Sequence, residues 1–441
     1  MTRSTLLILL LSSLFLLTSC GEDDGFTIEP VPTAFIVFVN AIPDSPELSI
    51  TSRGSLVSRV QFGAATLTLT VLPQVSLEYS ADFLSDGNIV NSLITTNENI
   101  AIGDTRLVIF SGTMDAPKVT SLTSAAADAS TTESQVIFLN ASTSANNVNL
   151  TLTNPNASTQ TINLPVDVVS EAIQVLTGAG SKIEVRDAAN NEILWDSGEF
   201  NFTAVTQRLI VLVDYFGPGN NTVRMFSITE QAGAGLFVNE QVESQIRFAN
   251  MTADRGALDV LADGILAADV LNFGDITNYQ DTETDVINYR FVTSGDPDDV
   301  ISTESRAILP GNFYTLAASG IGTTNGTTLI LDDRRRVPLR SVLNIARLAP
   351  SSGLLDIYLL EPGEGISRFP LVSQLGDSTA LTIDLVPSSY DLLLTAPGQS
   401  DSLFGPEPIT LSPNGIYSLF ITDTEGGGGP IRVQFLDDFT N

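Results

Sequence analysis

The sequence predicts an all-β fold of four tandem β-sandwich domains behind an N-terminal leader. Short segments such as Thr66–Val71 and Leu381–Leu385 alternate apolar and polar residues, and Gly, Pro, Asn and Asp separate them at short intervals. A related pattern recurs four times along the 441 residues. Because 43% of the residues are hydrophobic, each unit can bury a core despite the high net charge.

The leader, residues 1–19, has the features of a secretory signal peptide. Arg3 is the only charge before an apolar stretch that ends at Leu17 and is too short to span a bilayer. The last residues, Leu17, Thr18, Ser19 and Cys20, resemble the lipobox of bacterial lipoproteins, in which cleavage precedes a cysteine that takes a diacylglyceryl group. The alternative is an ordinary leader with a chance cysteine near its end. We predict a lipoprotein signal peptide with cleavage specified by Leu17 to Ser19 and lipidation at Cys20.

Lipidation would fix both the location and the redox chemistry of the chain. Cys20 is the only cysteine, so no thiol would remain for a disulfide, and stability would come from the cores alone. Residues 20–33 are acidic and contain prolines, which suits a flexible tether. Gly21 stands where an aspartate favours inner-membrane retention in well-studied bacteria. We therefore expect a lipid-anchored protein of the bacterial cell envelope, at the outer membrane, facing either the periplasm or the medium.

The four repeats can be aligned on one position near the start of each unit. Asn40, Asn140, Asn250 and Arg347 lie 100, 110 and 97 residues apart, which is one small domain per repeat. The short motifs VQFG, INLP, LNFG and SQLG follow in the same order. We expect sandwiches at 34–122, 135–232, 245–336 and 337–441. Residues 123–134 and 233–244 are expected to be linkers, and the first of these should let repeat one swing relative to the rest.

Two of these stretches also carry a family resemblance. FIVFVNAIPDSPELSI followed by VQFG, and VLNIARLAPSSGLLDIYLLE followed by LSPNGIYSLFITD, resemble the bacterial domain-of-unknown-function family 4397. The resemblance implies an exported or lipid-anchored protein with tandem Ig-like sandwiches. The family pattern has a histidine near the alignment point, where this chain has asparagine or arginine. The resemblance therefore brings no catalytic residue to this sequence.

Composition excludes several kinds of chemistry. The net charge is −31, which disfavours nucleic acid as a partner. The chain has no histidine, so Ser-His-Asp and Cys-His catalysis and His-ligated zinc are excluded. No cofactor motif is present. Paired carboxylates could still serve a glycan hydrolase or lyase, although the sequence cannot show which of the 51 acidic residues would pair.

A calcium site is the other use that the acidic residues suggest. Asp296, Asp298 and Asp299 are expected to lie in one loop, and hard cations favour clustered carboxylate oxygens. The spacing is not that of an EF-hand, because Ile301 stands where the loop needs glycine. A solvated turn is the simpler interpretation, so the three aspartates are weak calcium candidates.

Three further features have a structural and a functional interpretation. Arg334, Arg335 and Arg336, with Arg340 nearby, could bind lipid phosphates or acidic glycans, but the adjacent acidic residues favour charge compensation at a domain junction. Trp195 is the sole tryptophan and fits a core role better than a sugar-binding one.

The recurring Tyr314 and Tyr417 fit an inward face with a hydrogen-bonded hydroxyl. The glycine-rich segment 425–430 is expected to be a mobile hairpin loop.

The sequence as a whole favours a non-enzymatic, lipid-anchored envelope protein that acts as a multi-domain spacer or an interaction and adhesion module. Its expected partners are the membrane, through the anchor, and an envelope protein or glycan. Two alternatives stay open: a carboxylate-dependent glycan hydrolase or lyase, and a calcium-dependent adhesin.

Overall fold

The computed structural model describes residues 32–85, 88–124, 132–203, 207–218, 222–229, 233–366 and 369–438. These residues form β-strands and one short 3-10 turn, η1, at Pro350–Ser352. The predicted leader, with Leu17, Thr18, Ser19 and Cys20, lies outside them. No helix in the described ranges is long and apolar enough to cross a membrane.

The strands group into four β-sandwiches, which confirms the predicted fold class. The first sandwich contains β1 Ala34–Asn40, β2 Leu48–Ser52, β3 Ser55–Val60, β4 Leu69–Val71, β5 Leu77–Ser85, β6 Asn88–Glu98, β7 Thr105–Thr113 and β8 Ala116–Ser124. The second contains β9 Glu133–Asn140, β10 Asn147–Thr153, β11 Thr159–Pro165, β12 Ile173–Leu176, β13 Gly178–Asp187, β14 Ile193–Asp196, β15 Phe200–Phe202, β16 Gln207–Asp214, β17 Val223–Thr229 and β18 Gly233–Phe237.

The third sandwich contains β19 Ser244–Thr252, β20 Leu258–Ala262, β21 Ile265–Leu271, β22 Gln280–Thr282, β23 Val286–Thr293, β24 Asp296–Ala307, β25 Phe313–Gly320 and β26 Gly326–Asp332. The fourth contains β27 Ser341–Leu348, β28 Leu355–Leu360, β29 Val372–Leu375, β30 Thr379–Leu385, β31 Ser389–Thr395, β32 Ser402–Thr410, β33 Ile416–Thr422 and β34 Arg432–Asp437.

The four sandwiches share one topology. In the first, one sheet has the order β4-β1-β7-β8 and the other the order β3-β2-β5-β6, and the third and fourth repeat this arrangement. The second adds β18 at one sheet edge and β15 beside β13. In every sandwich the first strand pairs in parallel with a late strand: β1 with β7, β9 with β16, β19 with β25 and β27 with β33. The sheet that contains this parallel pair is called the parallel-pair sheet below.

Each sandwich has its own apolar core, and the two parallel strands of each parallel-pair sheet are buried on both faces. In β1, Ile36 and Phe38 point into the core of the first sandwich, whereas Val37 and Val39 join a separate apolar cluster. This alternation follows from the two-residue period of a strand. Both sets of side chains are apolar, so the strand reads as a continuous run, which is typical of sheets covered on both sides.

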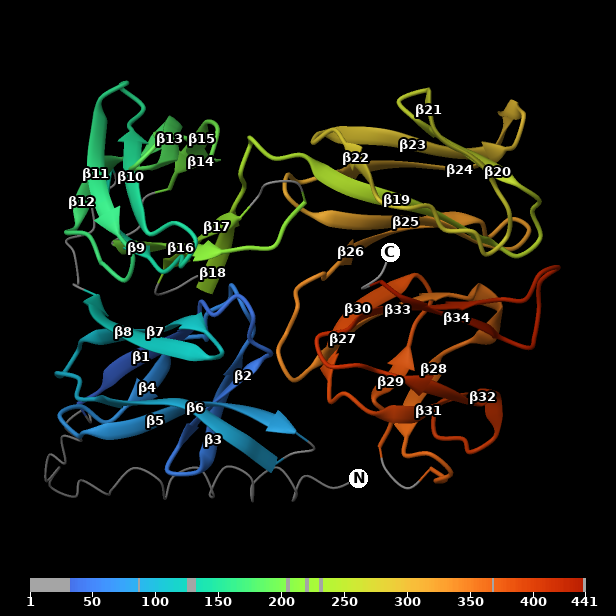
Figure 1. The fold of residues 1–441 in the computed structure, drawn as a ribbon, viewed down its shortest axis with the longest axis horizontal. Coiled ribbons are helices and arrows are strands. Elements are labelled where there is room, and N and C mark those ends of the chain that lie inside the picture. Colours follow the sequence, from blue (N-terminus) through green and yellow to red (C-terminus); the bar gives the residue numbers. More distant parts are fainter. Residues whose placement is uncertain are drawn as a thin grey trace, which may run out of the picture.

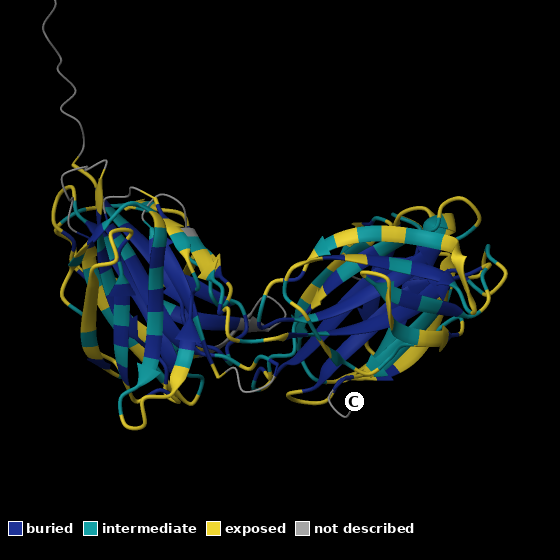
Figure 2. Ribbon diagram, turned by 90° about the horizontal axis from the view of Figure 1, so that it is seen from above, coloured by how far each residue is buried: buried dark blue, intermediate teal, exposed yellow. Residues whose placement is uncertain are grey.

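The outer apolar faces pair the sandwiches two by two. The parallel-pair sheets of the first and second sandwiches share one buried cluster, made of Val37, Val39, Ala41, Leu107, Ile109, Leu139, Ala141, Leu209, Val211, Val213, Phe226 and Ile228. Those of the third and fourth share another, made of Ala249, Met251, Ala317, Ile330, Ala346, Leu348 and Phe420. The chain thus forms two lobes, with the first sandwich below the second and the fourth below the third in Figure 1. From above, two bodies are joined by a narrow waist (Figure 2).

The pairing corrects the expectation that repeat one swings on a linker. An apolar interface between the first and second sandwiches would have to open for such a movement, which exposes buried surface to water. The expected linker 123–134 also begins within β8 and ends within β9, and its residues 125–131 lie outside the described ranges. Likewise, the expected linker 233–244 is wrong in part, because its first five residues form β18, which pairs with β17.

The glycine-rich segment 425–430 also differs from the expected mobile loop. It packs against the third sandwich, where the Gly426 amide donates a hydrogen bond to the carbonyl of Ala253. At Gly427, where φ is +82°, an added Cβ would lie 1.8 Å from the Cδ1 atom of Ile321. Glycine is favoured here because the positive φ strains other residues, and because a Cβ would force the end of the Ile321 side chain to move.

Candidate functional site

The repeated asparagines have a structural role in each sandwich. The Asn140 side chain is fully buried and donates to the carbonyls of Ala145 and Leu164 at 2.8 and 3.2 Å, and it accepts from the Ser142 amide at 3.1 Å. Asn40 and Asn250 make the corresponding bonds. Each asparagine therefore fixes the loop after the first strand to the end of the third strand. These residues are part of the fold and do not form a ligand site.

The second sequence landmark belongs to the same hydrogen-bonded unit. The amides of Gly63 and Gly274 donate to the carbonyls of Asn40 and Asn250 at 2.9 and 2.7 Å. Both glycines have positive φ, a conformation that side chains disfavour. This explains why VQFG and LNFG recur at a fixed place after the asparagine.

The aromatic residues singled out in the sequence are also structural. Trp195 is fully buried in the core of the second sandwich, as predicted. The hydroxyls of Tyr314 and Tyr417 each accept a hydrogen bond from a backbone amide five residues earlier, that of Leu309 at 3.2 Å and of Ser412 at 2.8 Å. Both rings lie in cores, which confirms the expected inward face.

A buried ionic cluster joins the third and fourth sandwiches. Arg247 of β19 donates to Asp438 at 2.7 Å and to Ser418 of the fourth sandwich at 3.0 Å. Its Nε donates to Thr315 at 2.7 Å, and a carboxylate oxygen of Asp332 lies 4.0 Å from its guanidinium. Burial alone would lower the pKa of Arg247, but the nearby Asp332 and Asp438 carboxylates raise it above its ordinary value. The cluster fixes how the two sandwiches of this lobe meet.

The predicted basic cluster lies where the two lobes meet. Arg335 forms a bidentate ion pair with Asp333, in which Nη2 donates to Oδ2 at 2.8 Å and Nε donates to Oδ1 at 3.1 Å. It also donates to the carbonyl of Ser45 at 3.3 Å and lies over the ring of Phe62, both in the first sandwich. Burial alone would lower the pKa of Arg335, but the Asp333 carboxylate outweighs it and raises the pKa. Charge compensation at a junction, the simpler of the two predicted roles, is thus what Arg335 performs.

The neighbouring arginines make similar contacts to other sandwiches. Arg334 lies over the rings of Tyr279 and Phe313 and donates to the backbone carbonyl of Asp438 at 2.9 Å. Arg340 lies over the ring of Phe83 in the first sandwich. An arginine stacked on an aromatic ring keeps its charge while burying its flat faces. The segment that links the third and fourth sandwiches therefore also connects the two lobes.

Three adjoining cavities run along this junction, and together we call them the inter-lobe cleft. Their volumes are about 270, 530 and 280 Å³. The first two share Glu47 and Asp384, and the last two share Phe62, Asp333 and Arg335. The second cavity by itself is in the size range of small-ligand sites, and the other two extend it. The cleft is our candidate functional site.

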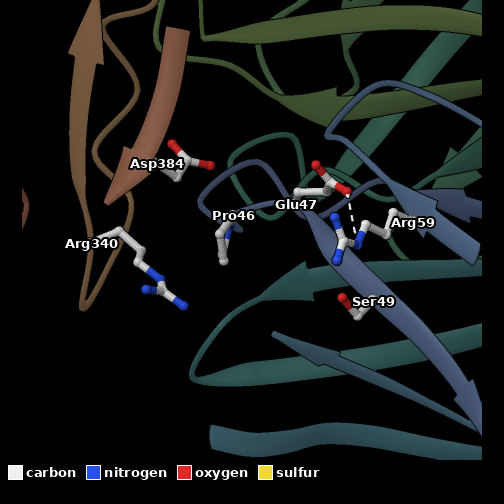
Figure 3. A pocket seen from close by; sticks show the side chains of 6 residues that line it. All are labelled: Pro46, Glu47, Ser49, Arg59, Arg340 and Asp384. Atoms are coloured by element: carbon white, nitrogen blue, oxygen red, sulfur yellow. Dashed lines mark ion pairs between the residues drawn. The ribbon is translucent and has the colours of Figure 1, made fainter. Parts of the chain in front are cut away.

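The first cavity lies between the first and fourth sandwiches. Figure 3 shows Arg340 and Asp384 on one wall, facing Pro46, Glu47 and the paired Arg59 on the other. The Glu47 carboxylate and the Arg59 guanidinium are 3.9 Å apart. Burial raises the pKa of Asp384, and the Arg335 charge opposes this increase.

The third cavity lies where the second and third sandwiches meet the linking segment. Arg224 of β17 lies over the ring of Tyr215, 3.5 Å from its centre, and donates to Asn312 Oδ1 at 2.9 Å. The Tyr215 hydroxyl donates to the carbonyl of Gly311 at 2.9 Å. Phe216, 57% exposed, lines the same cavity. Burial lowers the pKa of Arg224 below its ordinary value.

The three weak calcium candidates lie elsewhere. Asp296, Asp298 and Asp299 are in β24 and not in a loop, because the hairpin turn occurs earlier, at residues 294–295. All three are exposed, and Asp299 accepts a hydrogen bond from Thr293. Across the described ranges, no three acidic side chains converge in a way that could hold a metal ion. The structure therefore does not bring the candidates together.

The sequence analysis missed the residues of the cleft from the first and second sandwiches. Phe62 belongs to the repeated VQFG motif of the first repeat, but nothing in that motif relates it to Tyr215 and Arg224 of the second repeat. The sequence pointed to this region in one way. Strands β1, β7, β9 and β16 carry apolar residues on both faces, which indicates that a second surface packs against them. That signal predicts an interface but not its partner.

The fold and the cleft define a multi-domain β-sandwich protein, and comparison with known proteins adds a family for one part of it. Residues 244–358 match the family of a domain of unknown function, DUF4397. The match spans the third sandwich and reaches the second strand of the fourth. It confirms the resemblance to this family. No curated protein sequence matches the chain.

Two solved structures are similar at a low level. The Bacillus anthracis TIE protein has 9% identity over 89% of this chain and 68% of its own, with a TM-score of 0.15. A candidate cell adhesion protein from Parabacteroides distasonis ATCC 8503 has 11% identity over 69% of this chain and 98% of its own, with a TM-score of 0.14. At such TM-scores neither likeness bears on the function of this chain.

Proposed function

We propose that the protein is a non-enzymatic, lipid-anchored module of the bacterial cell envelope, at the outer membrane, that holds two lobes away from the membrane for contact with a protein or glycan. The observation that carries the proposal is the use of the apolar outer faces of the parallel-pair sheets within the molecule. Those faces join the sandwiches in pairs, so what remains for a partner is the outer surface of the sandwiches and the inter-lobe cleft.

The charge of the molecule favours binding to a specific partner over nonspecific adhesion. A net charge of −31 repels anionic surfaces and nucleic acid and keeps copies of the chain apart. Several of the 20 Lys and Arg residues, including Arg59, Arg224, Arg335 and Arg340, line the cleft. Because Glu47, Asp332, Asp333 and Asp384 line it too, the cleft carries nearly balanced charge, unlike the strongly negative chain as a whole.

A carboxylate-dependent glycan hydrolase or lyase is the second candidate, favoured by one observation. Glu47 and Asp384 lie on opposite walls of the first cavity, and burial raises the pKa of Asp384. A carboxyl group with a raised pKa that faces a second carboxyl group is the arrangement of acid and base in glycosidases. Glu47→Gln and Asp384→Asn would abolish such an activity, whereas a binding module would retain most of its affinity.

The anchor is tested by fractionation of cells that produce the full chain. We expect the wild type in the membrane fraction, carrying label from radioactive palmitate, and Cys20→Ala in the soluble fraction without label. Thr18→Ala serves as the matched control, because a small residue at that position preserves the lipobox. Wild-type protein without label would contradict the anchor. Addition of calcium to the purified chain, with melting temperature as the readout, tests the adhesin alternative.

A further inference from the structure

We infer that the third cavity of the inter-lobe cleft binds a sugar that carries a carboxylate, with Arg224 as the group that binds the carboxylate. The inference rests on the proposed role in partner contact and names the chemical class of the partner. The first observation is that the charged guanidinium of Arg224 forms no ion pair. Among the described residues, no carboxylate oxygen lies within 4.0 Å of its guanidinium nitrogens, and it donates hydrogen bonds to the carbonyl of Gly311 and to Asn312 Oδ1.

Arg224 is partly buried and forms no ion pair, and the carboxylate that acts on its charge, that of Asp333, is itself paired with Arg335. Buried charges are normally paired, because leaving water costs free energy that a partner must offset. The neighbouring Arg335 follows this rule through Asp333. Arg224 is instead held face-on to Tyr215, which leaves the edge of the guanidinium for further hydrogen bonds. A carboxylate in the cavity would supply the missing countercharge.

The other lining residues favour a sugar as the bearer of that carboxylate. Phe216 presents an exposed aromatic ring at this cavity, and aromatic rings pack against the apolar faces of sugars. Gln61, Asn312 and Thr382 line the same cavity with groups that donate and accept hydrogen bonds, as sugar hydroxyls require. The cavity continues into the second one, of about 530 Å³, so more than one sugar unit has room.

The overall negative charge does not prevent this binding. At physiological salt, exposed charges more than roughly 8 Å away are largely screened, so the lining residues dominate. Within this lining, Asp332 accepts hydrogen bonds from Thr315 and Tyr279, and Asp333 pairs with Arg335. Arg224 therefore keeps its attraction for an anion.

Isothermal titration calorimetry on the full chain in detergent tests the inference. The probes are a trisaccharide of galacturonic acid, a neutral trisaccharide of galactose, sodium acetate and inorganic phosphate. We expect the acidic trisaccharide to bind most tightly. Arg224→Gln should weaken it by about tenfold or more, as expected for the loss of one charge-assisted hydrogen bond, and leave the neutral trisaccharide unchanged.

A second variant covers the case in which Arg224→Gln disturbs the contact between the second and third sandwiches. Phe216→Ala should also weaken the acidic trisaccharide, while Arg306→Gln, an exposed arginine paired with Glu304, should not. Equal affinity for the two trisaccharides, or unchanged binding in both cleft variants, would overturn the inference. Acetate or phosphate binding as tightly as the acidic trisaccharide would overturn the assignment to a sugar. A failed anchor test with intact sugar binding would reject only the proposed function.

Discussion

At the scale of single residues, the repeated features of this chain satisfy the hydrogen bonds of the fold. Asn40, Asn140 and Asn250 are fully buried, and each donates a hydrogen bond to a backbone carbonyl of its own sandwich. In the fourth sandwich, Arg347 stands at the same position and donates hydrogen bonds to the carbonyls of Ala349 and Gly353. Repetition alone could not separate this role from ligand binding, because buried polar groups recur for either reason.

Replacement of a repeated asparagine should destabilise its sandwich. Asn140→Ala removes three hydrogen bonds and leaves the buried carbonyls of Ala145 and Leu164 without their side-chain partner. We expect a loss of about 2–4 kcal/mol in the free energy of unfolding, measured by chemical denaturation. Asn163→Ala, at an exposed position on β11, is the control and should cost less than about 0.5 kcal/mol. Equal losses for the two variants would refute the structural role.

The pH dependence of stability should contain a contribution from Asp214. Burial alone would raise the pKa of Asp214, but hydrogen bonds from Ser142, Ser144 and Thr143 outweigh it and lower the pKa below 3.8. Because the pKa is depressed in the folded state, the stabilisation is complete above pH 4–5 and is lost as the pH falls through the folded pKa. Asp214→Asn should be less stable at neutral pH, by about 1–3 kcal/mol, and should lose less stability on acidification. Parallel acid titrations of stability for the two proteins would contradict this.

At the scale of elements, the parallel-pair sheets decide how the sandwiches associate. Strand β16 places Ile210 and Leu212 in the core of its own sandwich and Val211 and Val213 in the interface with the first sandwich. A strand with one solvent face alternates apolar and polar residues, whereas this one is apolar on both faces. The two-residue period correctly predicted the strands. The apolar residues on the second face of β16 indicated that this sandwich packs against another.

A charge on the outer face of β16 should separate the first two sandwiches. Val211→Glu places a carboxylate in a buried apolar interface, which costs several kcal/mol unless the sandwiches part. We expect lower stability of the first lobe and new proteolytic cleavage within residues 123–134. Val300→Glu, at a position 41% exposed on β24, is the matched control and should leave both properties nearly unchanged. A Val211→Glu protein with the wild-type cleavage pattern would count against the interface.

At the scale of the whole molecule, the two lobes meet through polar and aromatic contacts, unlike the apolar interfaces within each lobe. Arg335 and Arg340 reach the first sandwich from the segment before β27, and Arg224 reaches the third from β17. Separating the lobes would therefore expose less buried apolar surface than separating the two sandwiches within a lobe. We therefore expect the lobes to move relative to each other more easily than the sandwiches within a lobe.

Loss of Arg335 should loosen the junction without unfolding either lobe. Arg335→Ala removes the bond to the Ser45 carbonyl and the contact with the Phe62 ring. Small-angle X-ray scattering should show a larger radius of gyration than for the wild type, while the unfolding midpoints change little. Arg306→Ala, exposed and distant from the cleft, should scatter like the wild type. Identical scattering by the Arg335→Ala and wild-type proteins would show that other contacts set the arrangement.

The sequence by itself determined the all-β class, the four repeats and the structural roles of Trp195, Tyr314 and Tyr417. These follow from local period and from spacing along the chain, which reflect how each sandwich buries its own core. Only the tertiary structure decided that the sandwiches pair, that residues 425–430 pack against Ala253 and Ile321, and that Arg224 lies in a cleft shared by both lobes. A local pattern shows that a face is apolar, but which distant surface covers it depends on the shapes of both partners.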